Sequence, residues 1–513
     1  MSRHNGKAGS DHISVLFVAS AAAIGGFLFG YDTAVINGAV GAIEAEFGIG
    51  SVELGFVVSS ALIGCAVGAW FAGQLANRLG RVRVMLYASI LFFISGVGSA
   101  LSFSTWELTI WRVVGGLAIG AASVIAPAYI AEISPANQRG RLGSLQQLAI
   151  VTGIFVALLV DYVLATVAGG AGESVPWGGT AWRWMFASAT IPAIAYAIMA
   201  LQIPESPRYL VSKHEISQAR DVLRRLLGGN VDKRIREIER SLESDKPVRV
   251  SDLKGPRFGL QPIVWVGILL SVFQQFVGIN VIFYYSSVLW QAVGFTESDS
   301  LVITVITSVT NIVTTLVAIS LVDKIGRKPL LLGGAAIMTI SLGTMAVIFA
   351  TAPIEPDATG QLEPVLGDMQ GTIALIAANV FVFGFGCSWG PVVWVLLGEM
   401  FGNRIRASAL ALAAAAQWIA NWTISTTFPW LADIGLGLAY GLYAGFALLA
   451  FLFVWRAVKE TKGRELEDMD RVPSTPLHAA GAHPPGARPP TPSNMVSRGR
   501  VVASTRARSR SAR

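Results

Sequence analysis

Long apolar runs separated by short polar segments are the dominant pattern along the chain. A helix that crosses a bilayer needs about 20 mostly apolar residues, and the pattern contains twelve runs of that kind. The sequence therefore predicts twelve membrane-spanning helices, at residues 13–38, 55–75, 84–104, 107–131, 143–165, 183–203, 262–290, 300–322, 329–351, 372–398, 407–431 and 437–457.

The loops between these predicted spans differ in charge. The loops after the first, seventh and ninth spans, residues 39–54, 291–299 and 352–371, contain Glu and Asp but no Lys or Arg. Basic residues crowd the loops after the second, fourth, sixth, eighth and tenth spans. Because positively charged loops stay in the cytoplasm, we expect these basic loops and both termini to be cytoplasmic.

Composition excludes several classes of protein. The chain of 513 residues is 53% hydrophobic and 14% charged, which is far too apolar for an ordinary soluble protein. The net charge of +7 is concentrated in particular loops, so it does not indicate a nucleic-acid partner. The five histidines lie in the tails and the central loop, and the two cysteines, Cys65 and Cys387, lie in predicted spans. We expect no metal site, no cofactor, no disulfide and no enzymatic site.

Two short motifs occur twice. Arg81 and Arg327 each follow a glycine and are 246 residues apart, and the ranges Glu132–Arg139 and Glu399–Arg406 each place an arginine seven residues after a glutamate. Repetition over about 250 residues indicates two six-helix halves. Parallel repeats with a binding site at their junction are typical of transporters.

The charged residues of these motifs also predict an ion-pair network. We expect pairs that tie the cytoplasmic helix ends when the site faces outward and that break when the two halves rock, each contributing about 0.2–1 kcal/mol because water reaches it. The alternative is that the motifs are ordinary basic turns. The residues expected in the network are Arg81, Glu132, Arg139, Glu205, Arg208, Arg327, Glu399 and Arg406.

The pattern predicts an all-α polytopic membrane protein with five parts. Residues 1–12 are expected to form an N-terminal tail, 13–203 the first six-helix bundle and 262–457 the second. Residues 204–261 alternate apolar and charged positions at helical spacing, which predicts cytoplasmic amphipathic helices between the bundles. Residues 458–513, rich in Pro, Ser, Ala and Arg from about 472 onward, are expected to be largely disordered.

Three carboxamides interrupt the seventh predicted span. Gln274, Gln275 and Asn280 are costly inside a bilayer unless they face protein, water or a ligand. On an unbroken helix Gln274 and Asn280 would point about 240° apart, but a break at Gly278 could bring them to one cavity. Uncharged amides suit a neutral polyhydroxyl ligand. The alternative is that the amides bind neighbouring helices together.

The Gly-Arg and Glu-to-Arg repeats, the segment Pro204–Arg208 and the amides of the seventh span together resemble the sugar porter family of the major facilitator superfamily. The resemblance covers about residues 12–465. It implies the major facilitator fold, transport of a monosaccharide, the proton as coupling ion, and a monomer in the lipid bilayer of a bacterial cytoplasmic membrane. Two positions depart from the family: Asn77 stands where an Asp is usual, and Ala189 where a symporter of the family has an acidic residue.

The resemblance also implies which residues bind the sugar. Gln147 and Gln417 follow the two Glu-to-Arg turns and can reach the bundle centre, and Trp394 follows Pro391, which invites a kink. The indole of Trp394 would offer an apolar platform to a sugar ring, or would instead anchor the helix at the lipid interface. The expected first set is Gln147, Gln274, Gln275, Asn280, Trp394 and Gln417. The second set, for packing or gating, is Phe29, Tyr284, Phe385, Trp389, Gly390, Trp418 and Asn421.

Asp32, in the first predicted span, is the candidate for proton coupling. Burial opposes its ionisation, and Arg112 in the fourth span is its expected counter-charge. Protonation would free Asp32 from Arg112 and favour the sugar-loaded state. The alternative is a fixed structural ion pair. Asp161, near the outer end of the fifth span, is expected at the membrane interface.

The leading expectation is therefore a transporter that imports a monosaccharide, a pentose or a hexose such as xylose or glucose, by proton symport and alternating access. A passive facilitator and a symporter of inositol-like polyols are alternatives within the same class. A sugar sensor that does not transport is an alternative from another class, although the C-terminal tail contains no recognisable signalling domain.

Overall fold

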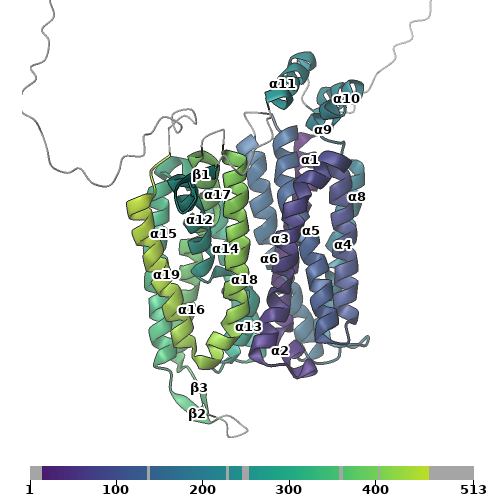
Figure 1. Cartoon of the computed structure of the whole chain (residues 1–513). Coiled ribbons are helices and arrows are strands. Elements are labelled where there is room, and N and C mark those ends of the chain that lie inside the picture. The colour runs from purple at the N-terminus through teal and green to yellow at the C-terminus, as the bar shows by residue number, and fades with distance from the viewer. Residues whose placement is uncertain are drawn as a thin grey trace, which may run out of the picture. The chain divides into compact units, whose positions relative to one another are not determined.

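The computed structural model describes residues 14–135, 139–226, 230–244, 253–356, 362–401 and 405–461. The predicted tail 1–12 and nearly all of 458–513 lie outside these residues, as do the side chains of Arg139 and Arg406. The described chain is almost entirely helical, as predicted (Figure 1).

The first half of the chain forms eight helices. They are α1 (Val15–Ala34), α2 (Ile36–Phe47), α3 (Ser51–Leu79), α4 (Arg81–Leu101), α5 (Thr105–Ile133), α6 (Arg139–Ala168), α7 (Ala181–Ser188) and α8 (Thr190–Gln202). The pairs α1–α2 and α7–α8 each make one interrupted span. The first span therefore continues to Phe47, beyond the predicted end at residue 38.

The second half repeats this pattern. Its elements are α12 (Pro262–Phe276), α13 (Ile279–Gln291), α14 (Glu297–Ile325), α15 (Arg327–Ala350), α16 (Asp368–Gly384), a π-helical segment (Phe385–Trp389), α17 (Gly390–Met400), α18 (Arg406–Ile434) and α19 (Leu436–Ala457). Two of its spans are interrupted, α12–α13 at Gly278 and α16–α17 at the π-helical segment.

Shorter elements lie outside the spans. Between the halves are α9 (Pro207–Ser212), α10 (Ile216–Leu226), α11 (Val231–Ser244) and the short strand β1 (Lys254–Arg257). The predicted amphipathic helices of the linker are thus present, and α9, α10 and α11 pack around their own small apolar cluster. Strands β2 (Ile354–Pro356) and β3 (Leu362–Pro364) form an antiparallel hairpin, which the sequence pattern did not predict.

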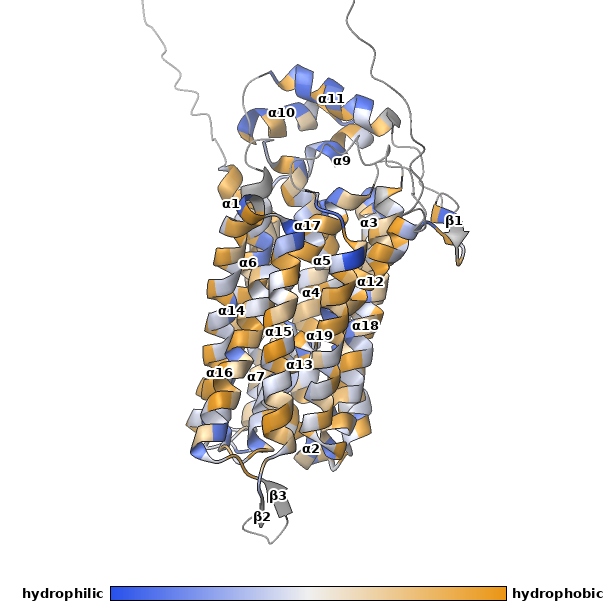
Figure 2. Ribbon diagram, turned by 90° about the vertical axis from the view of Figure 1, so that its left-hand side faces the viewer, coloured by the Kyte–Doolittle hydropathy of each residue, from blue (hydrophilic) through white to orange (hydrophobic). Residues whose placement is uncertain are grey.

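Eleven helices or helix pairs of the described residues are long and apolar enough to cross a membrane. The predicted span at 407–431 corresponds to α18, which has 29 residues but also carries polar side chains such as Gln417 and Asn421. Figure 2 shows hydrophobic colouring along the bundle and hydrophilic colouring on α10 and α11. Large apolar side chains such as Trp70, Ile191 and Ile340 are exposed, as a lipid-facing surface requires.

Two ends of the bundle can be distinguished. We call the end that carries α9–α11 the linker end, and the end that carries β2 and β3 the hairpin end (Figure 1). At the hairpin end one apolar core contains side chains from both halves, for example Val40 and Leu62 together with Ile282 and Phe428. At the linker end the first half has a core of its own, which includes Tyr129. The two halves are therefore packed together at the hairpin end and separate in their cores toward the linker end.

Candidate functional site

The predicted break in the seventh span is present at Gly278. Its backbone has a positive φ of 83°, which L side chains rarely adopt. A Cβ at this position would also lie 2.6 Å from Cδ2 of Tyr443. Conformation and space both favour glycine here, and the helix restarts at Ile279.

The break brings the three amides together. The side-chain amide of Asn280 donates to Oε1 of Gln275, and Nε2 of Gln275 lies 3.5 Å from Oε1 of Gln274. Gln274 and Gln275 are buried, and Asn280 is half-buried. We call these three residues the amide chain. Because each amide keeps further donor or acceptor capacity, the amide chain can exchange hydrogen bonds with a polyhydroxyl ligand.

One end of the amide chain is tied to the tenth span. Nε2 of Gln274 donates to the backbone carbonyl oxygens of Trp389 at 2.8 Å and Gly390 at 3.2 Å. These residues lie where the π-helical segment meets α17, one residue before Pro391. Single-turn π-helices occur frequently at functional sites. Gln274 thus also has the alternative role given in the sequence analysis, because its side chain holds a neighbouring helix.

The aromatic residues of the tenth span have different surroundings. The indole of Trp389 is fully buried and donates to the carbonyl oxygen of Leu331 on α15, which favours a packing role. The ring of Phe385 would lie 3.3 Å from a Cβ at Gly390, so these two residues are neighbours. Trp394 is 44% exposed. Its indole is therefore not enclosed by protein in this conformation.

Gln147 and Gln417 come from facing halves of the chain and both are half-buried. Oε1 of Gln417 is shielded from solvent and has no hydrogen-bond partner among the described residues. Oε1 of Gln146, the residue before Gln147, is also shielded and has no hydrogen-bond partner among the described residues. Gln146 packs against Gly26 of α1. Unpartnered buried amides are costly. Gln146 is a polar group that the sequence analysis did not select, although it adjoins Gln147.

Of the remaining aromatic and amide candidates, Phe29 and Trp418 join the two halves near this region, whereas Tyr284 and Asn421 both lie in the second half. The rings of Phe29 on α1 and Trp418 on α18 are 6.1 Å apart, and Trp418 packs against the cores of both halves. Tyr284 and Asn421 are buried and hydrogen-bond through their side chains. These contacts suit the predicted packing or gating role.

Asp32 and Arg112 lie together in the interior of the first half, as the sequence analysis predicts. Nη1 of Arg112 is 3.3 Å from Oδ2 of Asp32 and 3.0 Å from its carbonyl oxygen. The two side chains are only 7% and 3% exposed. Nε of Arg112 has no hydrogen-bond partner among the described residues. A buried pair with one long contact and an unsatisfied donor is incompletely stabilised, so a change of charge on Asp32 can separate it.

Hydrogen bonds between the halves lie at the hairpin end. The side-chain amide of Asn37 on α2 donates to the carbonyl oxygen of Phe283 at 2.9 Å, and its Oδ1 accepts from the backbone N–H of Ser287 at 3.1 Å. Oγ of Ser287 in turn donates to the carbonyl oxygen of Asn37. We call the contacts of Asn37 with Phe283 and Ser287 the Asn37 seal. The sequence analysis missed it, although an amide at the end of the first predicted span was a usable signal.

Two further contacts close the same end. The hydroxyls of Ser59 on α3 and Thr426 on α18 are 2.6 Å apart. The backbone N–H of Ala171 donates to Oε1 of Glu297, at the start of α14, at 2.8 Å. Each contact joins one half to the other, so the hairpin end is closed in this conformation.

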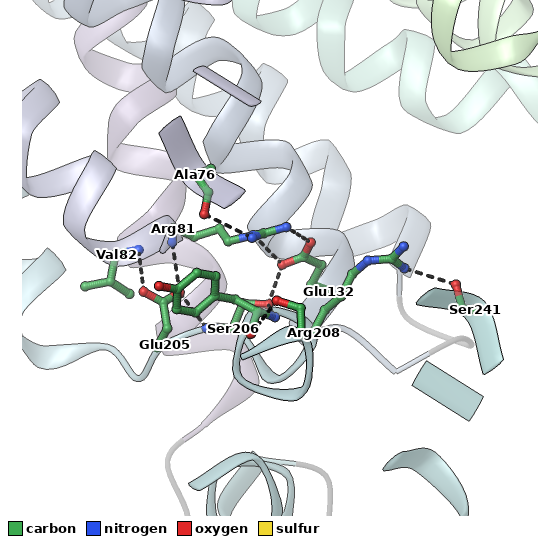
Figure 3. A network of polar contacts seen from close by, with 10 residues as sticks. Ala76, Arg81, Val82, Glu132, Glu205, Ser206, Arg208 and Ser241 are labelled. Carbon is green, nitrogen blue, oxygen red and sulfur yellow. Dashed lines mark hydrogen bonds and ion pairs between the residues drawn. The ribbon is translucent and has the colours of Figure 1, made fainter. Parts of the chain in front are cut away.

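At the linker end, three of the predicted ion-pair residues of the first half, Arg81, Glu132 and Glu205, form a single network (Figure 3). Nε and Nη2 of Arg81 donate to the two carboxylate oxygens of Glu132 at 3.1 and 2.9 Å, and Nη1 donates to the carbonyl oxygen of Ala76. The carboxylate of Glu205 accepts the backbone N–H groups of Arg81 at 2.9 Å and Val82 at 3.2 Å. We call Arg81, Glu132 and Glu205 the first clamp.

The second half contains the same arrangement. Nε and Nη2 of Arg327 donate to the carboxylate of Glu399 at 3.0 and 2.7 Å, and its Nη1 donates to the carbonyl oxygen of Val322. The carboxylate of Glu460 accepts the backbone N–H groups of Arg327 and Lys328. We call Arg327, Glu399 and Glu460 the second clamp. The internal repeat therefore extends to individual hydrogen bonds.

These clamps correct part of the predicted network. Each clamp lies within one half of the chain, so the described pairs hold helices of a single bundle rather than one bundle against the other. The side chains of Arg81 and Glu132 are only 11% and 13% exposed, so the expectation of water-accessible pairs is wrong here. Arg208 donates to Oγ of Ser241 on α11 at 3.3 Å.

Glu205 titrates differently from an exposed carboxylate. Burial raises the pKa of its carboxyl above the ordinary value, while hydrogen bonds from Ser206, Arg81 and Val82 and the charge of Arg81 oppose that shift. Burial is the largest of these causes.

We expect Arg81→Met to destabilise the protein by about 3 kcal/mol, because it leaves the carboxylate of Glu132 buried without its cation. Arg327→Met is the matched variant in the second clamp, where Glu399 is 30% exposed and the loss should be smaller. Arg224→Met removes an arginine that is 68% exposed and should change little. The free energies of unfolding of the three purified variants, measured in detergent, check this order of stability losses. An Arg81→Met variant no less stable than Arg224→Met would contradict it.

Comparison with known proteins agrees with the fold and with the motifs. The family model described as "Sugar (and other) transporter" matches residues 18–472. A glucose transport protein of Synechocystis sp. is 57% identical over 458 residues, which cover 89% of this chain and 97% of that protein. The D-xylose-proton symporter of Escherichia coli is 39% identical over 485 residues, covering 88% and 94%.

A solved structure supports the same assignment. The inward-open conformation of the xylose transporter of Escherichia coli matches with a TM-score of 0.74 at 37% identity, over 89% of this chain and 99% of that one. The family match covers both bundles and the linker between them. The chain is therefore a multi-pass membrane protein with the twelve-helix major facilitator fold, and it belongs to the sugar porter family, whose members are sugar transporters and not enzymes.

Proposed function

We propose that this chain imports a monosaccharide together with protons, by alternating access across a bacterial cytoplasmic membrane. The observation that carries the proposal is the amide chain of Gln274, Gln275 and Asn280 at the break of the seventh span. It offers donors and acceptors without charge, which suits neutral sugar hydroxyls. No cofactor enters the proposed cycle.

The proposed sugar site also includes Gln147, Gln417 and Trp394. The two glutamines come from opposite halves, and the unpartnered Oε1 of Gln417 is available to accept a hydroxyl. The half-exposed indole of Trp394 can cover the C–H face of a sugar ring. A pentose or a hexose, such as xylose or glucose, fits this chemistry. Glucose is the first sugar to test, because the relative with 57% identity carries its name.

Asp32 and Arg112 are the proposed coupling pair. A proton that reaches Asp32 cancels the charge that holds Arg112, and the weakly satisfied pair separates. Release of the proton restores the pair. Because the pair is intact while the hairpin end is closed, this conformation corresponds to the stage after the proton has left.

Charge supports the proposed orientation. The linker end carries the two clamps and α10, which has three arginines and one aspartate, so the positive-inside rule favours a cytoplasmic position for this end, with both termini on the same side. The closed hairpin end is then the outer face, and the protein is inward-facing. We propose a monomer surrounded by lipid as the working unit.

Uptake by purified protein in proteoliposomes tests the proposal. We expect radiolabelled xylose, glucose or both to accumulate when the outer solution is acidic, and only to equilibrate without a pH gradient. Galactose, arabinose and inositol complete the panel. Equilibration under both conditions would identify a passive facilitator, preference for inositol would identify a polyol symporter, and binding without uptake would identify a sensor.

A further inference from the structure

Asp161 on α6 is a second carboxyl inside the first half. The sequence analysis expects it at the membrane interface, but it is 0% exposed. Oδ2 of Asp161 accepts the backbone N–H of Gly38 at 3.1 Å. Oδ1 is buried and has no hydrogen-bond partner among the described residues. A carboxyl group in this environment is unusual, because charged groups inside a membrane protein are normally paired.

The position of Gly38 explains how the carboxyl reaches the backbone. Gly38 is the third residue of α2, directly after the interruption at Val35, where N–H groups lack partners within the helix. A Cβ at this position would lie 2.6 Å from Cβ of Asp161 and 2.8 Å from its Oδ2. Glycine therefore allows α6 to approach, and Asp161 supplies the acceptor that the interrupted helix lacks.

No cation among the described residues neutralises Asp161. The nearby charged and titratable groups on the helices packed against α6 have other partners. On α1, Tyr31 bonds Ser188, and Asp32 pairs with Arg112 of α5. Glu46 of α2 pairs with Arg183 of α7, and Glu297 of α14 bonds Ala171. Helix α2 itself contains no Lys or Arg that could neutralise Asp161. A carboxylate sealed from water without a cation is strongly disfavoured, so this conformation suits the protonated acid.

The contact lies beside the Asn37 seal. Asn37 and Gly38 are consecutive at the start of α2: Asn37 binds Phe283 and Ser287 of the other half, and Gly38 binds Asp161 of its own half. The start of α2 therefore carries two adjacent contacts, one to the second half through Asn37 and one to Asp161 through Gly38. Separation of the hairpin end would admit water to the carboxyl and favour its ionised form.

We infer that Asp161 is a second proton-binding group, separate from the Asp32–Arg112 pair, whose protonation favours the closed hairpin end and whose ionisation favours its opening. One proton passes from the outer solution to Oδ1 and returns there, and no other bond is made or broken. The inference deepens the proposed proton-coupled transport and rests on it for its role in the cycle. The gate itself can be tested without sugar or transport.

The test measures access to the hairpin end with Ser59→Cys, in a background where Cys65 and Cys387 are replaced by alanine. Ser59 is fully buried in the closed end and reacts with a membrane-impermeant maleimide only when that end opens. Val52→Cys, on the same helix and 66% exposed, corrects for the pH dependence of the thiol itself. Labelling is measured in proteoliposomes at several outer pH values.

We expect corrected labelling of Ser59→Cys to rise about fivefold or more between pH 5.5 and 8, since one proton-linked equilibrium shifts by up to tenfold per pH unit. Asp161→Asn keeps an acceptor for Gly38 but cannot ionise, so labelling should stay low and flat. Gly38→Ala forces the carboxyl away and should raise labelling at every pH. Asp221→Asn, at a carboxylate on α10 whose side chain is 64% exposed, should keep the pH dependence.

A pH slope that survives in Asp161→Asn, or that is absent from the parent, would overturn the inference. If Asp161→Asn does not yield folded protein, Asp161→Ser gives the same prediction of a flat profile. The outcome is independent of the coupling proposal. Should Asp32→Asn still accumulate sugar, the proposed role of Asp32 fails, while the labelling profile still decides the role of Asp161.

Discussion

Asp32→Asn is expected to abolish uphill sugar accumulation and to leave sugar counterflow intact. Asparagine keeps the size of the side chain but neither binds nor releases a proton, so Arg112 keeps one invariant neighbour throughout the cycle. A gradient of one pH unit corresponds to about 1.4 kcal/mol, or a tenfold accumulation for one proton. We expect this ratio to fall to about one in the variant, measured with radiolabelled sugar in proteoliposomes.

Counterflow, the exchange of labelled for unlabelled sugar without a gradient, serves as the internal control of folding. Asp221→Asn is the matched acid-to-amide control, because this residue lies on α10 and its side chain is 64% exposed. It should accumulate sugar as the parent does. Accumulation against a gradient by Asp32→Asn would remove Asp32 from the coupling step and leave the fixed ion pair as the better interpretation.

Gln274→Ala is expected to weaken sugar binding by about 1–3 kcal/mol, the cost of a hydrogen bond lost from a desolvated site. That corresponds to an increase in Kd of roughly fivefold to 150-fold. The structure adds a second reason for a large effect. Gln274 donates to the carbonyl oxygens of Trp389 and Gly390, so its loss also loosens the segment that precedes Trp394. Calorimetric titration of purified protein with sugar measures the change.

Two further variants separate these causes. Gln275→Ala removes an amide that bonds its neighbours within the amide chain, so it should weaken binding with less effect on thermal stability. Gln291→Ala is the matched control, since this glutamine lies at the end of α13 and donates to the carbonyl oxygen of Ser287. Its affinity should equal that of the parent. Unchanged affinity in Gln274→Ala would exclude Gln274 from the site.

Much of the architecture could be predicted from local sequence because its causes are local. Apolar length determines a span, and the glycine between the amides of the seventh span indicates a break that the structure contains at Gly278. The repeat of Arg81 at Arg327 indicates two equivalent halves, which the two clamps reproduce bond for bond. The pairing of Asp32 with Arg112 follows from the high cost of isolated charges inside a bilayer.

Other features depend on contacts between distant segments, which the pattern along the chain does not contain. The predicted end of the first span at residue 38 is too early, because α2 continues the helix to Phe47 and packs against α13. Asp161 has no sequence neighbour that indicates its burial; only the approach of Gly38 creates its environment. The 44% exposure of Trp394 follows from how the surrounding helices pack, which local composition does not determine.

Prolines and glycines indicated kinks but not their geometry. Pro391 was expected to bend the tenth span, and the structure places a π-helical segment, Phe385–Trp389, directly before it. The polar partner that stabilises this segment is Gln274, which is 115 residues away from Trp389. Such a cross-helix bond cannot be inferred from either segment alone.

The two clamps have a consequence for how the polypeptide is assembled. Glu205 lies three residues after the end of α8, and Glu460 lies three residues after the end of α19. The last residue of each clamp therefore comes at the end of its own half and binds helices of that half. The segment from α9 to β1 acts as a tether between two self-contained modules. Cleavage of the chain within that tether would remove no residue of either clamp. The first clamp can also form before the ribosome has synthesised the second half.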